Sequence, residues 1–368
     1  MKKLPKVHVV KTGKVVEGQT YRVYVGRKDE EIVCLALSQY GWLTIGMLPE
    51  ELPEELRDAM TLEDKEANGC TCMGIAVLRA DSCSFPGVGQ FYDPVLDQAE
   101  PAAPHEIGAY DMLDEVAAAA VAGSHAYLAD GRGLRVVEVS APTAPVEVGS
   151  YDTPGSGADV AVVGNLAYVA AYWAGLRILD ITDPTAPVEV GFSDMPDVAY
   201  GVVVAGSYAY VADGAAGLRV VDVTDPANPT EVGAYDTPGT AWDVAVNGTY
   251  AYVADDDFGL RVVNISDPVH PSEEGYYDTA GWAQGVGVAG TTAYVADGEG
   301  LRVIDVSNPA HPTEAGFSET SGWGAQGVQV VGDLAYVADG DGGVRVLSIA
   351  SAASIREVAY YDTSGGAA

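Results

Sequence analysis

Carboxylates dominate the side chains of this sequence that could take part in chemistry. The chain has 53 Asp and Glu residues against 19 Lys and Arg, with five His and four Cys. It contains no phosphate-binding Gly-rich loop, no Gly-x-Ser-x-Gly nucleophile elbow and no His-Glu-x-x-His zinc motif. His270 and His311 occupy equivalent Pro-flanked loop positions, where solvated turns are expected. A pair of carboxylates can be chosen from 53 in many ways, so their presence does not distinguish an enzyme from a protein without catalytic activity.

The cysteines lie in the first quarter of the chain, at Cys34, Cys70, Cys72 and Cys83. The last three could supply thiolates to a metal ion. Zinc sites, however, usually have two or more residues between paired cysteines, and no His lies near these. Disulfide bonds or free thiols are therefore expected, and no cofactor is expected.

Two acidic turns are candidates for calcium binding. One holds Asp255, Asp256 and Asp257, and the other holds Asp339 and Asp341. Calcium loops of the EF-hand type take twelve residues with Asp, Asn, Gly and Glu at fixed positions, and neither turn has that pattern. Tight turns are the expected role of these residues, with calcium binding as the alternative.

Arginine and glutamate recur at a fixed step. Ligand sites rarely recur in every repeat of a protein, whereas Arg and carboxylate side chains commonly form structural ion pairs. We therefore expect each Arg to pair with nearby carboxylates. The arginines are Arg135, Arg177, Arg219, Arg261, Arg302 and Arg345, and the glutamates are Glu106, Glu147, Glu189, Glu231, Glu314 and Glu357.

The repeat that carries these residues predicts the fold. Units begin at Ala109, Ser150, Phe192, Ala234, Tyr276 and Phe317, in steps of 41, 42, 42, 42 and 41 residues. A period of about 40 to 45 residues is typical of the four-stranded blade of a β-propeller. The expected fold class is therefore all-β, a β-propeller with blades of about 42 residues.

Each unit contains four strand-like runs. Val, Ile and Tyr fill the runs, and Gly, Pro, Asp and Asn lie between them. Asp213-Gly214 predicts a tight hairpin between the second and third strands, and Asp225-Pro226 predicts a turn between the third and fourth. In the unit from Phe192 the strands are expected at 201–204, 208–211, 218–221 and 231–235.

The repeat resembles a known family. The runs Ala209–Asp213, Gly217–Val223 and Asp225-Pro226 resemble the LVIVD repeat of bacterial and archaeal proteins, and the match recurs six times over about residues 95–363. The resemblance implies a prokaryotic β-propeller, commonly surface-associated and without a known general chemistry. Ala171-Tyr172-Trp173 replaces the Asp-Gly turn, and Ser348–Ser354 lacks the Asp-Pro pair, so these loops are expected to differ.

Seven blades, six regular and one degenerate, are favoured over six. His105–Asp111 has the sequence of a fourth strand, and Val95–Pro104 aligns without a gap to Val220–Pro229. The front half of this degenerate blade is expected at Gly74–Leu78 and Cys83–Phe85. A closed ring also removes exposed strand edges. A six-bladed ring with a leftover strand is the alternative.

Residues 1–70 lie outside the repeat and precede the propeller at residues 72–368. Strands are predicted at Lys6–Val10, Thr20–Val25 and Glu31–Leu37, and a short acidic helix at Pro53–Lys65. A small α+β domain or capping segment is therefore expected.

Charge and hydropathy limit the partners and the location. The net charge of -34 opposes binding to nucleic acid or to anionic lipid. The sequence has no run of about 18 apolar residues, so no membrane-spanning helix is expected. The apolar stretch before Lys11 is too short for a secretory signal. The sequence as given thus predicts no export, whereas the resemblance implies an extracellular or cell-surface location, and a cytoplasmic location stays open.

Aromatic side chains gather in loops that a propeller would place on one face. These loops are the hairpins between strands two and three and the connections into the next blade. Their aromatic residues change from unit to unit, which is unusual for core positions, and aromatic side chains with polar neighbours suit recognition. The candidate ligand-binding residues are Tyr172, Trp173, Tyr200, Trp242, Asp243, Trp282, Gln284, Trp323 and Gln326, with Asp159, Asp256, Asp257 and Phe258 beside them.

We expect a non-enzymatic binding or scaffold protein that uses this face for adhesion or for contact with a protein or glycan partner. Trp242, Trp282 and Trp323 would serve as stacking platforms, or alternatively each would plug the gap between adjacent blades. A carbohydrate-active hydrolase or lyase that uses carboxylates on the same face is the alternative function. A third is a spacer for the N-terminal segment.

Overall fold

The computed structural model describes residues 24–28, 31–37, 43–45, 104, 107–110, 112, 114–320, 322, 324–340 and 342–361. The chain divides into two compact units, residues 1–83 and 84–368. In the part of the chain that the structure describes, no helix is long and apolar enough to span a membrane.

The first unit contributes an antiparallel three-stranded sheet in the order β1-β2-β3. Its strands are β1 (Tyr24–Lys28), β2 (Glu31–Leu37) and β3 (Leu43–Ile45). The predicted strand at Glu31–Leu37 is confirmed as β2. The predicted helix at Pro53–Lys65 and the boundary after residue 70 lie outside the described residues, as do Cys70, Cys72 and Cys83. The described part of this segment is β-structure, so its α+β class stays a prediction.

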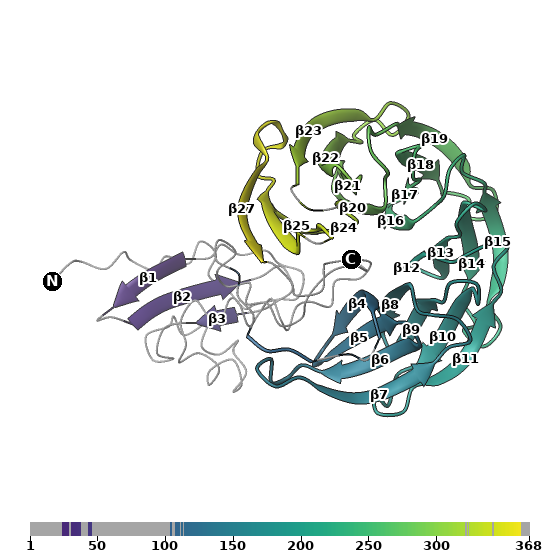
Figure 1. Cartoon of the computed structure of the whole chain (residues 1–368), viewed down its shortest axis with the longest axis horizontal. Helices are drawn as coiled ribbons and strands as arrows, with labels where there is room; N and C mark the ends of the chain where they lie inside the picture. Colours follow the sequence, from purple (N-terminus) through teal and green to yellow (C-terminus); the bar gives the residue numbers. More distant parts are fainter. Residues whose placement is uncertain are drawn as a thin grey trace. The chain divides into compact units, whose positions relative to one another are not determined.

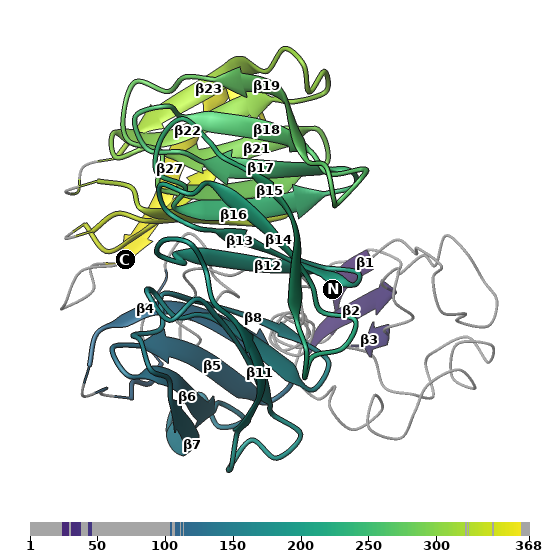
Figure 2. The same ribbon diagram turned by 90° about the vertical axis from the view of Figure 1, so that its right-hand side faces the viewer.

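The second unit contains six antiparallel four-stranded sheets, each with its strands in sequence order. Figure 1 shows the sheets arranged radially, with the first strand of each sheet at the centre and the fourth on the outer rim. The turned view in Figure 2 shows the broad faces of neighbouring sheets against one another. This arrangement is a β-propeller, which confirms the predicted fold class with six blades among the described residues. The predicted seventh blade falls on residues 72–111, most of which lie outside them.

The blades are numbered one to six in chain order. The first, innermost strands are β4 (Val116–Ala122), β8 (Asp159–Val163), β12 (Gly201–Ala205), β16 (Asp243–Asn247), β20 (Gly285–Ala289) and β24 (Gly327–Val331). The second strands are β5 (His125–Asp130), β9 (Leu166–Ala170), β13 (Tyr208–Ala212), β17 (Tyr250–Ala254), β21 (Thr292–Ala296) and β25 (Leu334–Ala338).

The third strands are β6 (Gly133–Glu138), β10 (Leu176–Asp180), β14 (Leu218–Asp222), β18 (Leu260–Asn264), β22 (Gly300–Asp305) and β26 (Val344–Ser348). The fourth are β7 (Val146–Asp152), β11 (Val188–Ser193), β15 (Thr230–Tyr235), β19 (Ser272–Tyr277), β23 (Thr313–Glu319) and β27 (Arg356–Tyr361). The strands predicted for the unit from Phe192 are confirmed to within one residue at each end.

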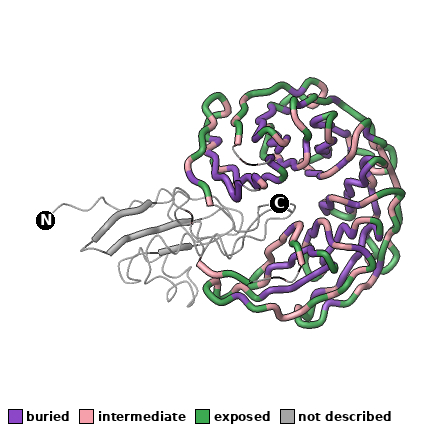
Figure 3. Tube along the Cα trace, in the orientation of Figure 1, coloured by how far each residue is buried: buried purple, intermediate pink, exposed green. Residues whose placement is uncertain are grey.

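Apolar clusters between adjacent blades hold the propeller together. Five clusters each take buried side chains from two neighbouring blades. Tyr210 and Leu218 of blade three pack with Val244 of blade four. Side chains alternate between the two faces of a sheet, so Ala209 and Val221 pack toward blade two instead. Figure 3 shows the buried residues along the inner strands and the exposed residues along the outer rim.

A glycine on the fourth strand lets adjacent blades approach closely. A Cβ atom added at Gly191 would lie 2.1 Å from the carbonyl oxygen of Pro226 in the next blade. The strand has a β-bulge beside this glycine, because its register with β10 shifts between Ile178 and Leu179. Only glycine fits such a backbone approach. The same close contact recurs at Gly149, Gly233, Gly275 and Gly316.

The predicted turn residues have their expected roles. Gly214 has a φ of +52° in the hairpin between β13 and β14. Asp225 accepts a hydrogen bond from the backbone N–H of Ala227 at 3.2 Å. The Ser348–Ser354 loop, which departs from the repeat, contains the 3-10 helix η2 (Ala352–Ser354). His270 lies in an exposed turn and hydrogen bonds to Asp267.

Candidate binding site on the loop face

Two kinds of loop meet on one face of the propeller. The hairpin between the second and third strands of one blade lies against the connection that enters the next blade. Between blades two and three, the backbone N–H of Ala199 donates to the carbonyl of Tyr172 at 3.1 Å. Between blades four and five, Asp256 and Ala283 exchange two hydrogen bonds of 3.0 Å. Backbone hydrogen bonds therefore fix these loops to each other.

Tyr172 and Asp256 have positive φ angles of 46° and 52°. The equivalent hairpin positions of blades three, five and six are Gly214, Gly298 and Gly340, which also have positive φ. Residues with a Cβ atom adopt this conformation at a cost, and the cost is larger for Tyr than for Asp. Strained positions of this kind cluster at functional sites. Blades two and four thus present a side chain where the turn itself favours glycine.

Three aromatic rings from three successive blades form a stack. The ring centroids of Tyr172 and Tyr200 lie 5.6 Å apart in an edge-to-face arrangement. The centroids of Tyr200 and Trp242 lie 4.2 Å apart with the rings tilted by 37°. Such pairs stabilise by about 0.5–1.5 kcal/mol beyond the area that they bury. Tyr200 and Trp242 each stand at the entry to an innermost strand, β12 and β16, so the stack follows the centre of the loop face.

Two further Trp side chains on this face are largely exposed. Trp173, in the hairpin of blade two, is 68% exposed, and Trp282, in the connection from β19 to β20, is 61% exposed. Phe258, in the hairpin of blade four, is also exposed. Side chains this exposed contribute little to folding, so they are free to contact a partner.

Asp256 connects the aromatic stack to Trp282. Burial and the charge of Asp257 raise the pKa of Asp256, and the indole N–H of Trp242 lowers it. The Trp242 Nε1 atom is buried and makes no hydrogen bond of good geometry. Asp256 is also bonded through its backbone to Ala283, the residue after Trp282. We call the continuous set Tyr172, Trp173, Tyr200, Trp242, Asp256 and Trp282 the loop arc.

Asp159 and Asp243 join adjacent blades and face no solvent. Asp159 is 2% exposed, and its two carboxylate oxygens accept 2.8 Å hydrogen bonds from the backbone N–H groups of Val160 and Val202. Burial raises the pKa of Asp159 to about 6, although these two hydrogen bonds oppose the shift. Asp243 is 4% exposed and accepts from Val286 in the next blade at 2.8 Å. The predicted ligand-binding role of Asp243 therefore has no support from its position.

The recurring arginines form structural ion pairs, as predicted. Arg135 lies 2.8 Å from both Asp130 and Asp152 and is itself buried. Arg177 has no hairpin Asp to pair with, because Ala171 stands at that position. Its nearest carboxylate is Glu189 at 3.6 Å.

Four of these arginines also have an aromatic partner that was not predicted from the sequence. In four blades an aromatic residue at the same position of the fourth strand lies over the guanidinium group. The rings and their distances to the Arg carbon are Phe192 over Arg177 at 4.6 Å, Tyr276 over Arg261 at 4.5 Å, Phe317 over Arg302 at 3.9 Å and Tyr360 over Arg345 at 5.0 Å. Cation–π pairs of this kind stabilise by about 0.5–1 kcal/mol. The shared position of these four rings in their units was the available signal.

Two of the calcium candidates, Asp255 and Asp339, are engaged in contacts within the fold. Asp255 is fully buried, accepts hydrogen bonds from Thr237 and Gly239, and lies 3.7 Å from Arg261. Among the residues that the structure describes, no group of three or more His, Cys, Asp or Glu side chains is placed to hold a metal ion.

Asp339 accepts hydrogen bonds from Thr320, Gly322 and Arg345, so its carboxylate is also occupied within the fold. Asp341 lies outside the described residues.

The remaining predicted site residues are dispersed. Gln284 is half-buried and Gln326 is exposed, each at the entry to an innermost strand, and Trp323 lies outside the described residues. Trp242 directly precedes its innermost strand, whereas Trp282 stands three residues before β20. The two Trp residues therefore occupy different positions of the repeat and do not form equivalent platforms.

The fold and the loop face define a repeat β-propeller. Six LVIVD repeats match residues 116–153, 154–194, 198–237, 238–279, 280–320 and 324–363. Because these matches cover well over half of the chain, the protein belongs to the LVIVD-repeat family. Among proteins of curated function, none matches the sequence.

Solved structures with this fold are distant in sequence. A protein from Lactobacillus plantarum has a TM-score of 0.60 and 15% identity over 71% of this chain and 89% of its own. The WD40 repeats of RRP9 have a TM-score of 0.58 and 11% identity over 70% of this chain and 83% of their own. A Bacteroides uniformis protein named as a candidate 6-phosphogluconolactonase has a TM-score of 0.54 and 14% identity over 64% and 81%. At these identities the similarity shows the fold alone.

Proposed function

We propose that this protein is a non-enzymatic binding module that holds a protein or glycan partner against the loop arc. One observation carries the proposal: Trp173 and Trp282 are 68% and 61% exposed on a loop face that inter-blade hydrogen bonds hold rigid. Rigid aromatic side chains gain contact area at a low entropic cost, and they are the usual anchors of recognition surfaces.

The arrangement of the arc supports two anchor positions flanking a packed centre. Tyr200 and Trp242 are half-buried and fixed by stacking, so they supply a preformed floor. The carboxylate of Asp256 adds a polar group beside that floor. A preorganised surface of this kind loses little entropy on binding. The arc draws on blades two to five only, so the proposal is the same for a ring of six or seven blades.

Catalysis at this face has no comparable support. Among the described residues, the carboxyl groups with a raised pKa apart from Asp256 are Asp159, Asp213 and Asp255, and all three are buried in contacts within the fold. A general acid or base must reach a substrate atom within hydrogen-bond distance. The expected surface location, which the family resemblance suggests, forms part of the binding proposal and would place the arc toward extracellular partners.

The test is a glycan array probed with the full-length protein, with and without calcium, followed by pull-down of protein partners where the array is blank. Trp173→Ala and Trp282→Ala should each lower affinity at least tenfold without changing the melting temperature. Tyr276→Ala, which removes a ring 53% exposed on the outer rim, is the matched control and should leave binding unchanged. Binding that survives both Trp substitutions, or product release from a polysaccharide, would overturn the proposal.

A further inference from the structure

The propeller holds its own arginines between an aromatic ring and carboxylates. The guanidinium carbon of Arg261 lies 4.5 Å from the centre of the Tyr276 ring, and its Nη2 atom lies 2.8 Å from Asp278. Arg302 is held in the same way by the ring of Phe317 and by Glu314. A ring together with a carboxylate is therefore the arrangement by which this fold binds a cation.

The two exposed Trp rings of the loop arc hold no such cation. In the part of the chain that the structure describes, five rings pair with an arginine, and neither Trp173 nor Trp282 is among them. Trp binds cations more strongly than Tyr or Phe does. Both rings are largely exposed, so a cation from another molecule can reach them.

Trp282 stands beside two carboxylates. Asp256 exchanges backbone hydrogen bonds with Ala283, the residue after Trp282, and the exposed Asp257 follows Asp256 in the chain. Burial, and after it the charge of Asp257, raise the pKa of the Asp256 carboxyl group, so the two carboxylates act on each other. Among the described residues neither of them forms an ion pair with a basic side chain, and Arg261 of the same blade pairs with other carboxylates.

Trp173 has a carboxylate at its own seam. Its neighbour Tyr172 is hydrogen bonded to Ala199 in the connection that enters blade three, and Asp197 lies in the same connection. Burial, the neighbouring Tyr172 and the charge of Asp197 raise the pKa of Tyr200, so this charge acts on the aromatic stack. Asp197 accepts a 2.7 Å hydrogen bond from a backbone N–H of the next hairpin. Within the described residues it has no basic partner, because the arginines of blades two and three pair elsewhere.

The blades that form the loop arc offer no exposed Lys or Arg side chain. Residues 154–320, which make up blades two to five, contain 24 Asp and Glu residues, four Arg and no Lys. Each Arg side chain is at most 12% exposed and lies no more than 3.9 Å from two or three carboxylates. Ion pairing therefore leaves an excess of negative charge in these blades, and the resulting field attracts a cationic partner.

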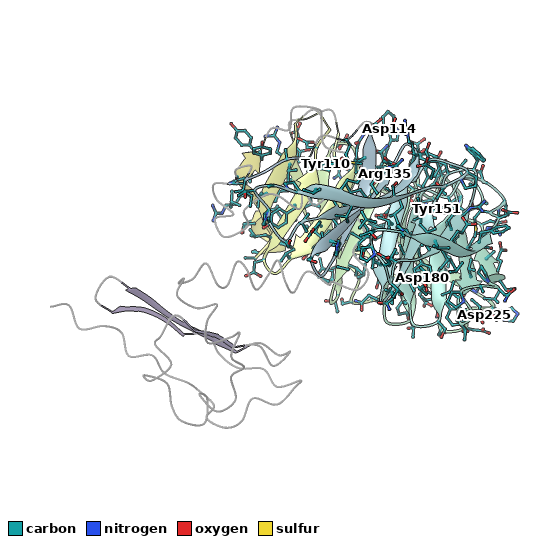
Figure 4. All side chains as sticks on the ribbon, turned by 90° about the horizontal axis from the view of Figure 1, so that it is seen from below. Tyr110, Asp114, Arg135, Tyr151, Asp180 and Asp225 are labelled. Atoms are coloured by element: carbon teal, nitrogen blue, oxygen red, sulfur yellow. The ribbon has the colours of Figure 1, made fainter. Side chains whose placement is uncertain are left out.

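Negative charge alone does not distinguish the loop face from the opposite face. In Figure 4, Asp114, before β4, lies at one face of the propeller, and Asp225, after β14, lies at the other. The carboxylates around Asp225 serve their own turns, where each accepts a hydrogen bond of 3.0–3.2 Å from the backbone N–H two residues later. These residues are Asp183, Asp225 and Asp267. Among the described residues, those turns expose no aromatic ring, so only the loop face combines rings with carboxylates.

We propose that the loop arc binds a basic segment of a protein partner, whose Lys or Arg side chains lie over Trp173 and Trp282 and pair with Asp197, Asp256 and Asp257. This inference rests on the proposed binding function and names the chemistry of the partner. A guanidinium or ammonium group satisfies a ring and a carboxylate at once. A neutral glycan brings no charge to these carboxylates, and an anionic one is repelled by them.

Fluorescence anisotropy of a labelled peptide, measured against the full-length protein, tests the proposal. The peptide has about nine residues in which Arg alternates with Gly and Ser. In the control peptide citrulline, the neutral isostere of Arg, replaces every Arg. The Arg peptide should bind at least tenfold more tightly than the citrulline peptide. Its affinity should fall at least tenfold between about 50 mM and about 500 mM salt, because salt screens exposed charges.

Two triple variants remove the same charge from opposite faces of the propeller. The loop-face variant combines Asp197→Asn, Asp256→Asn and Asp257→Asn. The control variant combines Asp183→Asn, Asp225→Asn and Asp267→Asn. The first should bind the Arg peptide at least tenfold more weakly than the parent protein, and the second should differ from the parent by less than twofold. Asn keeps an acceptor oxygen for the turn hydrogen bonds, so both variants should keep the melting temperature of the parent.

Substitution of the rings separates a cation–π contact from a general apolar contact. Trp173→Leu and Trp282→Leu keep an apolar side chain but remove the ring face. Each should lower the preference for the Arg peptide over the citrulline peptide at least threefold.

Equal affinity for the two peptides, or no measurable binding of the Arg peptide, would overturn the proposal. Equal losses in the two triple variants would also overturn it, because the peptide would then follow the net charge of the whole protein. A neutral glycan whose binding needs Trp173 and Trp282 but not the three carboxylates would overturn the cationic partner and leave the binding function standing. If no peptide, glycan or protein binds the loop arc, both proposals are wrong.

Discussion

The carboxylate of Asp213 lies 3.7 Å from the Nε atom of Arg219, too far for a hydrogen bond. In blade one the equivalent atoms of Asp130 and Arg135 lie 2.8 Å apart. One oxygen of Asp213 and the Nε of Arg219 are both buried without a hydrogen-bond partner. Burial, only partly offset by a backbone hydrogen bond from Asp197 and by Arg219, raises the pKa of Asp213 to about 7.

This arrangement predicts a loss of stability as the pH rises. The folded pKa of Asp213 exceeds the unfolded value of about 3.9, so its contribution is complete below about pH 4 and is lost toward pH 7. Asp213→Asn cannot titrate and should remove about 2–4 kcal/mol of this pH dependence. Chemical denaturation between pH 4 and pH 8 measures it. Parallel profiles for the variant and the parent protein would contradict the prediction.

Restoring a missing hydroxyl group should lower the pKa of Asp213. In blade four, the hydroxyl of Thr237 donates to Asp255, but Met195 stands at the position of Thr237 beside Asp213. Met195→Thr supplies a donor, and Met195→Val is a control of the same shape without one. At pH 8 the Thr variant should be more stable than the Val variant by about 1–2 kcal/mol. Equal unfolding free energies would show that the hydroxyl does not reach the carboxylate.

The hydrogen bond from Asp159 to the next blade should contribute more to the free energy of unfolding than the contacts of a surface carboxylate do. Asp159→Ala leaves the buried N–H groups of Val160 and Val202 without their acceptor, at a cost of about 2–5 kcal/mol. Asp159→Asn keeps one acceptor and should cost less. Asp225→Ala, in an exposed loop, should cost under about 1 kcal/mol. Urea denaturation ranks the three variants, and a loss at Asp159 no larger than at Asp225 would refute the role.

Substitution of the three Trp residues of the loop arc should lower the free energy of unfolding by different amounts. Trp242→Ala removes a half-buried ring that stacks on Tyr200 and should cost about 1–3 kcal/mol. Trp173→Ala and Trp282→Ala remove exposed rings and should change the unfolding free energy by less than about 0.5 kcal/mol. Calorimetry of the three variants checks this order. A large loss at Trp282 would mean that it packs between blades.

The sequence by itself determined the blade, its four strands and most of its turns. These features are local: alternating Val and Tyr, Asp-Gly pairs and Asp-Pro pairs act within about ten residues, and six copies make the pattern unambiguous. The pairing of arginines with carboxylates was also predictable, because both recur at the same step. Asp225 in its turn and Arg135 in its ion pair confirm this at the level of single residues.

Only the tertiary structure decided which loop residues meet. Tyr172, Tyr200 and Trp242 come from three blades, and no local pattern in the sequence predicts that their rings contact one another while Trp282 stays exposed. Asp243 was predicted to belong to a binding surface, whereas its carboxylate joins two blades. Contacts between blades join residues about 40 positions apart at distances set by backbone approach, so they depend on the packed ring and not on any one repeat.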